Sequence, residues 1–358
     1  MMNKVINGKV DFEQIKHLLS LQDREEISNL FAIARETRDT HIGNKVYLRG
    51  LIEYSNHCSK NCYYCGIRAG NKNAFRYEVN DNEVLEAAKF ACENRYGSIV
   101  LQSGERSDKK FIAHISELIQ KIHDATNNSL RITLSCGEQS EEVYRTWYEL
   151  GAQRYLLRIE ASNPGLYKKL HPDNKNHSYE RRLEALKTLI NIGYQTGTGV
   201  MIGLPFQTLD DLANDLIFIR NCGVVMIGMG PYIEHAETPL FKYRDELLPP
   251  EKRVELSLKM IAILRLLRPS INIASTTALQ TLDPMGREKG LRAGANVIMP
   301  NITPVQYKKN YDLYEGKPCL NDEPSDCGSC IEKRIEMAGC EVAYGDWGDS
   351  KAYHRAGI

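Results

Sequence analysis

The sequence of 358 residues has no excess charge of either sign, with 46 basic and 46 acidic side chains and a pI near 7.1. We therefore expect no global electrostatic attraction to nucleic acid or to an anionic membrane. No apolar run approaches the length that spans a bilayer, and no charged-then-apolar leader stands at the polar opening Met1–Lys4. These absences predict a cytoplasmic protein that acts on a small molecule, with neither nucleic acid nor membrane as a partner.

Ten cysteines are present, although nothing in the sequence indicates secretion. In a reducing compartment, such thiols favour metal ligation over disulfides. Cys58, Cys62 and Cys65 form a C-x3-C-x2-C loop directly after the strand-like run 46–54. Thiolates are soft ligands suited to iron-sulfur clusters or zinc, and a site short of a fourth ligand keeps one position open for substrate or cofactor. The alternatives are a zinc knuckle, completed by His57 or a distant histidine, and three unrelated cysteines.

After this loop, short strand-like runs alternate with helical segments as far as residue 299. Together with the run before Cys58 they make eight β/α repeats. This rhythm predicts a complete (β/α)8 barrel of the TIM type, and a doubly wound open sheet is the main rival. We assign residues 1–45 to an N-terminal helical cap, 46–303 to the barrel and 304–358 to a C-terminal extension that contains cysteines.

The carboxyl ends of the strands are where such barrels keep their sites. On the fourth strand, period-two alternation puts Arg154, Leu156, Arg158 and Glu160 on one inward face. Two guanidiniums against one carboxylate leave a net positive interior, which predicts a bound anion such as an amino-acid carboxylate. The alternative is an internal ion pair between Glu160 and an arginine, with no ligand.

The C-terminal extension carries a second group of thiols. Cys319, Cys327 and Cys330 form a C-x7-C-x2-C pattern, three cysteines within twelve residues. This spacing predicts a second metal cluster or a zinc site, with Cys340 available to complete a structural site.

The cysteine loop, with its aromatic Tyr64 before the last cysteine, resembles the signature of the radical S-adenosylmethionine (SAM) superfamily. Nearly the whole chain is similar to the HydE family of FeFe-hydrogenase maturases. The strand-end segments and the tail separate it from the relatives biotin synthase and methylornithine synthase. The resemblance rests on the two cysteine patterns and on four further segments, Leu101–Glu105, Arg154–Arg158, Gly203–Pro205 and Gly294–Asn301. Two positions depart from the family pattern, with Ile159 in place of a histidine and His171 in place of an arginine.

The resemblance implies that the cysteine loop holds a 4Fe-4S cluster, and that the reduced cluster cleaves SAM to a 5'-deoxyadenosyl radical. It implies a second iron-sulfur cluster, 2Fe-2S or 4Fe-4S, on the three tail cysteines. The implied SAM contacts are Tyr64, Gln102, Ser103, Gly104, Glu105, Glu160, Arg182, Gly199 and Gly203. The implied substrate contacts are Arg154, Arg158, Met226, Thr276, Thr277, Tyr311 and Tyr314.

The implied substrate is an iron-cysteine complex that bears carbonyl and cyanide. It would be remodelled towards the di-iron subcluster of the hydrogenase H-cluster. Other hydrogenase maturases and an electron donor are the expected transient partners. One alternative is a radical SAM enzyme that acts on another small thiol or amino acid, as biotin synthase or methylornithine synthase does. The other is a non-catalytic metal-binding scaffold.

Overall fold

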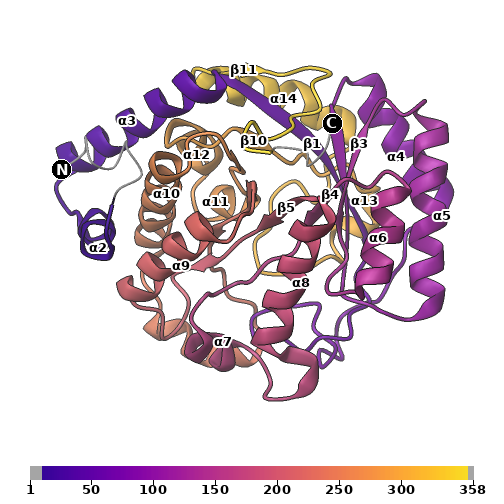
Figure 1. Cartoon of the computed structure of the whole chain (residues 1–358), viewed down its shortest axis with the longest axis horizontal. Helices are drawn as coiled ribbons and strands as arrows, with labels where there is room; N and C mark the ends of the chain where they lie inside the picture. The colour runs from indigo at the N-terminus through magenta and orange to yellow at the C-terminus, as the bar shows by residue number, and fades with distance from the viewer. Residues whose placement is uncertain (1–9, 354–358) are drawn as a thin grey trace.

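The structure of the chain, a computed structural model, describes residues 10–353, apart from the side chains of residues 325–329. One curled sheet forms its centre, and helices cover the outer face (Figure 1). The strands of the sheet are, in chain order, β1 (Lys45–Ser55), β2 (Ser98–Ser103), β3 (Arg131–Ser135), β4 (Arg154–Leu156), β5 (Gln195–Thr198), β7 (Met226–Ile227), β9 (Asn272–Ile273) and β10 (Val297–Ile298). No helix among the described residues is long and apolar enough to cross a membrane.

These eight strands pair in the order β10-β1-β2-β3-β4-β5-β7-β9, and every pair is parallel. The two outer strands approach each other at a bridge between Ala274 and Val297, where the amide of Ser275 donates to the Val297 carbonyl at 2.8 Å. The expected fold is thus confirmed in its broader form, an α/β fold around a curled parallel sheet. Because the strands are parallel, their carboxyl ends meet at one rim.

Two short strands, β6 (Met201–Ile202) and β8 (Gly230–Pro231), pair with each other beyond the ends of β5 and β7. The helices between the strands are α4 (Asp81–Glu93), α5 (Lys109–Ala125), α6 (Glu141–Glu149), α7 (Pro164–Leu170), α8 (Tyr179–Ile192), α9 (Leu209–Asn221), α10 (Pro250–Leu267), α11 (Thr277–Leu282) and α12 (Gly286–Arg292). Two 3-10 turns add η1 (Lys175–His177) and η2 (Pro239–Glu246).

The helical lead-in consists of α2 (Phe12–Ser20) and α3 (Arg24–Ile42), which pack on the outside of α9 and α10 (Figure 1). The turn between the two helices is fixed by Lys259 of α10. Its buried ammonium group donates to the carbonyls of Leu19 and Leu21 and pairs with Glu255 at 2.9 Å. The lead-in therefore belongs to the outer layer and supplies no side chain to the rim.

After β10 the chain forms α13 (Val305–Lys308), α14 (Pro324–Met337) and β11 (Glu341–Val342). Strand β11 pairs in parallel with the start of β1, and α14 packs on α12. Arg334 of α14 pairs with the buried carboxylate of Glu288 of α12 at 2.7 Å. The extension is thus packed against the sheet and its helices.

The last described segment returns to the amino-terminal end of the sheet. Arg154, the first residue of β4, is fully buried and donates to the carboxylate of Asp349. Gln195, the first residue of β5, donates to the same carboxylate at 2.6 Å, and Asn272 of β9 donates to the carbonyl of Gly348 at 2.8 Å. Three strands are therefore joined to this segment at their amino-terminal ends, opposite the rim where the carboxyl ends meet.

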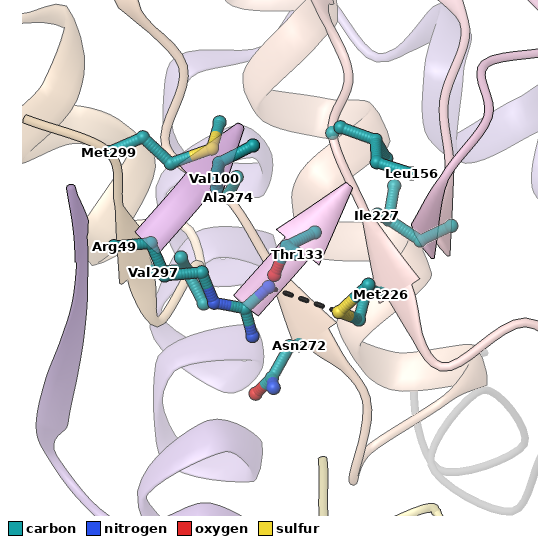
Figure 2. Close-up of a pocket in the computed structure, with 11 residues that line it drawn as sticks. Arg49, Val100, Thr133, Leu156, Met226, Ile227, Asn272, Ala274, Val297 and Met299 are labelled. Atoms are coloured by element: carbon teal, nitrogen blue, oxygen red, sulfur yellow. Dashed lines mark hydrogen bonds between the residues drawn. The ribbon is translucent and has the colours of Figure 1, made fainter. Parts of the chain in front are cut away.

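Further along the strands from this segment, their inner faces line a small cavity of about 20 Å³, which has room for about one water molecule (Figure 2). The Arg49 guanidinium reaches across it and donates to the Met226 sulfur at 3.0 Å. The cavity is lined by Arg49, Val100, Thr133, Leu156, Met226, Ile227, Gly228, Asn272, Ala274, Val297 and Met299.

We predict that Asp349→Ala lowers the free energy of unfolding by about 2 to 4 kcal/mol, because it removes the carboxylate partner of a buried guanidinium. Urea denaturation measures the change, with Glu336→Ala, an exposed site on α14, as the control. A loss no larger than that of the control would show that the pair with Arg154 does not stabilise the fold.

Candidate active site

The cysteine loop begins where β1 ends, at the rim of the sheet. Burial, and then the neighbouring Cys58 thiol, raises the pKa of Cys62 to about 12. Burial, and then the two other thiols, raises the pKa of Cys65 well above its usual range. The three sulfurs thus lie close enough to repel one another as thiolates. A cationic iron cluster would reverse this effect by stabilising all three thiolates, so the donor set fits such a group.

The end of β2 packs tightly against the first cysteine. A Cβ atom on Gly104 would lie 2.4 Å from the His57 carbonyl oxygen and 2.8 Å from the Cys58 Cβ atom, so only glycine fits there. The next amide, that of Glu105, donates to the Cys58 sulfur at 3.4 Å, and the amide of Ser59 donates to the Glu105 carbonyl at 2.8 Å. Amide donors to ligand sulfurs are one of the ways in which proteins tune iron-sulfur clusters.

Two further segments hold the other side of the loop. The amide of Tyr63 donates to the Leu170 carbonyl at 2.9 Å, and the Tyr63 carbonyl accepts from the amide of Leu240 at 3.1 Å. The hydroxyl of Tyr64 lies 3.2 Å from Nε2 of His171. Within residues 10–353, apart from the side chains left undescribed, no group of three His, Cys, Asp or Glu side chains is compact enough for a single metal ion.

A network of four charged side chains lies beside the cysteine loop. Lys60 pairs with Glu105 at 2.9 Å and with Glu138 at 3.1 Å. Arg182 pairs with the same two carboxylates, at 3.1 Å and 2.7 Å. All four side chains are at most 12% exposed, so the ion pairs are screened little by water. Arg182, which we expected to face the SAM carboxylate, is thus held by two acidic residues at the ends of β2 and β3.

Sequence reasoning missed two members of this network. Glu138 follows β3 by three residues, and the strand-end argument applied to β2 and β4 would have found it. Lys60 lies within the cysteine loop and has no sequence signal of its own, because its partners come from distant strands. We regard both as part of the site, since they fix Glu105 and Arg182.

The predicted charged face of the fourth strand is divided between the two ends of the sheet. Arg158 and Glu160 form a bidentate pair at the rim, with distances of 2.8 Å and 2.9 Å. This is the internal ion pair that was the alternative to a bound anion. Arg154 lies at the opposite end, where Asp349 supplies its carboxylate. The structure therefore corrects the anion site predicted from both arginines, since its two guanidiniums do not meet.

The glycines predicted to approach SAM lie close to other backbone and side-chain atoms. A Cβ atom on Gly199 would lie 1.8 Å from the Gly228 carbonyl oxygen, so this position needs glycine. Gly203 has a φ of +81°, in the left-handed region that favours glycine. Of the remaining expected SAM contacts, Gln102 is half-buried and Ser103 is buried, both in the last two positions of β2.

The expected substrate contacts are distributed unevenly. Thr276 and Thr277 begin α11 at the rim, where the Thr277 hydroxyl accepts from Arg287 at 2.8 Å. Tyr311 is fully buried and interacts with Gln102, and burial raises the pKa of the half-buried Tyr314 to about 12. Met226 instead lines the internal cavity. The structure therefore brings the threonines and tyrosines to the rim but not Met226 or Arg154.

The tail cysteines lie beyond a segment that is tied to the sheet. Lys317 pairs with the buried carboxylate of Glu53 on β1, which also accepts from Asn301 at 2.9 Å. Cys319 and Cys330 are exposed, and the side chain of Cys327 lies outside the described residues. Cys340 is buried. The accessory cluster thus stays a prediction.

Known proteins share the sequence pattern and the fold of this chain. The pattern of the Radical SAM superfamily matches residues 52–219. The chain is 44% identical to the FeFe-hydrogenase maturase subunit HydE of Thermotoga maritima, over 98% of this chain and 97% of that protein. It is 27% identical to the 3-methylornithine synthase of Methanosarcina acetivorans, over 95% and 93% of the two chains. The crystal structure of methylornithine synthase (PylB) superposes with a TM-score of 0.81 at 25% identity and covers 96% of this chain and 97% of that one.

The fold and the cysteine loop thus define a radical SAM enzyme. Within that superfamily, the chain belongs to the HydE family of FeFe-hydrogenase maturases. Membership implies a 4Fe-4S cluster and SAM as cofactors. The three neighbouring thiols fit the cluster, and the glycines and charged groups at the rim fit a zwitterionic ligand such as SAM.

The loop that follows Glu160 is held from behind by α9. The amide of Ser162 donates to Asp215 at 2.7 Å, and the Asn163 side chain donates to Asp211 at 2.6 Å. Glu160 itself has a φ of +65°, which is strained for a residue with a side chain. Burial raises the pKa of Asp215 to about 7, and its second oxygen has no partner in the described structure.

We predict that Asp215→Asn removes a pH dependence of stability. The folded state binds the Asp215 proton more tightly than the unfolded chain, so this group makes the free energy of unfolding fall as the pH rises from about 4 to about 7. Urea denaturation across this range measures it, with Asp210→Asn on the exposed side of α9 as the control. Parallel pH profiles for wild type and Asp215→Asn would contradict the assignment.

Proposed function

We propose that this chain uses SAM at the cysteine loop to remodel a small substrate during assembly of the FeFe-hydrogenase H-cluster. The observation that carries the proposal is the loop of three neighbouring, half-buried thiols beside the Lys60, Glu105, Glu138 and Arg182 network. When bound, the cluster and SAM supply a one-electron reductive cleavage that gives a reactive organic radical. The remaining chemistry of the site is binding, orientation and exclusion of water by the chain itself.

The residues at the rim have distinct proposed roles. Cys58, Cys62 and Cys65 hold the cluster, and the Glu105 amide donates to the first of these sulfurs. Glu160 and Arg182 orient the polar groups of SAM, because both are fixed by ion pairs and remain within reach of the rim. The complete set proposed for SAM is Tyr64, Gln102, Ser103, Gly104, Glu105, Glu160, Arg182, Gly199 and Gly203.

The substrate is proposed to lie deeper, between the inner faces of the strands. Arg158, which follows β4, has a side chain that is 30% exposed, and this supports access to the interior just below the rim. We propose that Arg158, Thr276, Thr277, Tyr311 and Tyr314 contact the substrate. An iron-cysteine complex with carbonyl and cyanide ligands offers an amino-acid carboxylate for such groups. Arg154 and Met226 are omitted, because they lie at the other end of the sheet and in the internal cavity.

The wider organisation is part of the same proposal. Residues 1–45 form the helical cap, 46–303 a closed (β/α)8 barrel, and 304–358 the extension with an accessory cluster. The bridge between Ala274 and Val297 supports closure of the barrel. The cysteine chemistry suits a reducing cytoplasm. The proposed partners are an electron donor and the other maturases, from which the substrate comes.

We predict that Ala at any one of Cys58, Cys62 and Cys65 abolishes formation of 5'-deoxyadenosine from SAM under dithionite. Two remaining thiolates cannot hold a cubane with one positioned open iron. The iron content per chain is measured in parallel and should fall for each variant. Cys222→Ala, at an isolated thiol at the end of α9, is the control and should keep both cluster and activity. Normal cleavage by any of the three single variants would refute the central proposal.

We predict that the tail cysteines are not needed for SAM cleavage. Replacing Cys319, Cys327 and Cys330 together by Ala should lower iron content but leave dithionite-driven formation of 5'-deoxyadenosine within about twofold of wild type. The physical reason is that the tail cysteines lie on the extension, where Cys319 and Cys330 are exposed, whereas the half-buried cluster thiols lie at the rim. A folded triple variant unable to cleave SAM would contradict this independence; lower stability alone would not.

A further inference from the structure

A surface of paired cations and aromatic rings lies beside the cysteine loop. It is formed by the end of α7, the turn after β6, and η2, and α7 marks its place in Figure 1. The ammonium nitrogen of Lys169 lies 5.2 Å from the ring centroid of Phe206. The rings of Phe206 and Tyr243 pack edge to face, with their centroids 4.7 Å apart. We define the rim patch as Lys169, Phe206, Phe241, Lys242, Tyr243 and Arg244.

Phe206 combines an unusual backbone conformation with an exposed side chain. Its φ is +67°, a strained value for a residue with a bulky side chain, and its ring is 38% exposed. The turn is held in place by Gln207, whose side chain accepts from the amide of Gly203 at 2.7 Å and donates to the carbonyl of Met201 at 2.9 Å. A strained residue that presents an aromatic ring to solvent is typical of a contact surface.

The rim patch is joined directly to the cysteine loop. Leu170, next to Lys169, and Leu240, next to Phe241, bond the amide and the carbonyl of Tyr63. Tyr63 stands between the second and third cysteines of the loop. Leu170, Leu240 and Tyr63 also belong to one small apolar cluster beneath the patch. A partner seated on the patch would therefore approach the cluster site through a short, well-packed layer of protein.

The charge of this surface differs from that of the chain as a whole. Exposed cations are Lys168, Lys169, Lys242 and Arg244, against the exposed acids Asp245 and Glu246, which gives a local net charge of +2 in a chain whose total is zero. Long cationic side chains that lie over aromatic rings form a surface that is both positively charged and apolar. Such a surface suits a partner rich in carboxylates.

We propose that the rim patch docks the protein that delivers the electron for SAM cleavage, and that this donor is an acidic one-electron carrier. The inference rests on the proposed function, because only an enzyme that reduces a cluster needs such a donor. One electron leaves the carrier and enters the cluster in each cleavage, and no bond forms or breaks at the patch. Complementary charge speeds the encounter, and the exposed rings supply the close contact.

The test compares two reductants. An acidic flavodoxin in its hydroquinone form serves as the protein donor and dithionite as the small-molecule donor, with 5'-deoxyadenosine as the readout. Lys169→Glu/Lys242→Glu should lower the flavodoxin-driven rate roughly tenfold and leave the dithionite-driven rate within about twofold, because charge at an interface acts mainly on association. Lys89→Glu/Lys187→Glu makes the same change in charge on α4 and α8 and should leave both rates unchanged.

Ionic strength gives a second readout. The flavodoxin-driven rate of wild type should fall as salt is raised from about 0.02 M to about 0.3 M, and that of the double variant should depend on salt much less. Phe206→Gly keeps the left-handed backbone while it removes the ring. It should raise the flavodoxin concentration needed for half-maximal rate, with little change in the maximal rate.

Four outcomes would overturn the docking site. They are a normal flavodoxin-driven rate in the patch pair, equal losses under both reductants, a loss in the control pair as large as in the patch pair, and failure of flavodoxin to drive the wild-type enzyme while dithionite does. Docking of another maturase instead would appear as a patch variant with normal flavodoxin-driven cleavage but impaired transfer of substrate. Absence of cleavage by wild type under dithionite would instead refute the proposed function, so the two failures are distinguishable.

Discussion

Parallel pairing of the strands is the constraint on which the site depends. Because all eight strands run the same way, the cysteine loop after β1, Glu105 after β2 and Glu138 after β3 meet at one rim although up to 80 positions separate them. The loop can approach β2 only because Gly104 has no side chain. The ligand residues are contiguous in sequence, but their surroundings are assembled by the sheet. Changes that shift the register of β1 against β2 would therefore disturb the cluster site before they unfold the protein.

How far the sequence predicts this molecule depends on the range of the interaction. Strand rhythm and the spacing of Cys58, Cys62 and Cys65 are local, and both predicted the architecture and the class of chemistry. Strand alternation predicted that Arg154 and Arg158 share a face, but it carried no information about their depth. At about 3.3 Å per residue, four positions place them roughly 13 Å apart, so that Arg158 lies beyond the end of β4. The expectation of one anion site failed for this reason.

Contacts between distant segments could not be predicted from local sequence patterns. The carboxylate that neutralises Arg154 comes from Asp349, nearly 200 residues later in the chain. Lys60 binds two acids from other strands, and Lys317 ties the extension to Glu53. Nothing in the local sequence marks these lysines, because an isolated lysine in a polar loop is ordinarily solvated. The strained backbone of Phe206 likewise has no signal in the local sequence, since the turn around it is held by the hydrogen bonds of the Gln207 side chain.

Buried charge is neutralised differently at the two ends of the sheet. At the amino-terminal end, the fully buried guanidinium of Arg154 is neutralised by Asp349 of the chain itself, so it needs no ligand. At the rim, Arg158 and Glu160 pair through side chains that are 30% and 13% exposed. Water and ligands can therefore reach that pair, and its ion-pair bonds can be exchanged for bonds to a zwitterion without burying an uncompensated charge. The location of the catalytic end thus follows from where the chain leaves its charges accessible, as much as from where it places its cysteines.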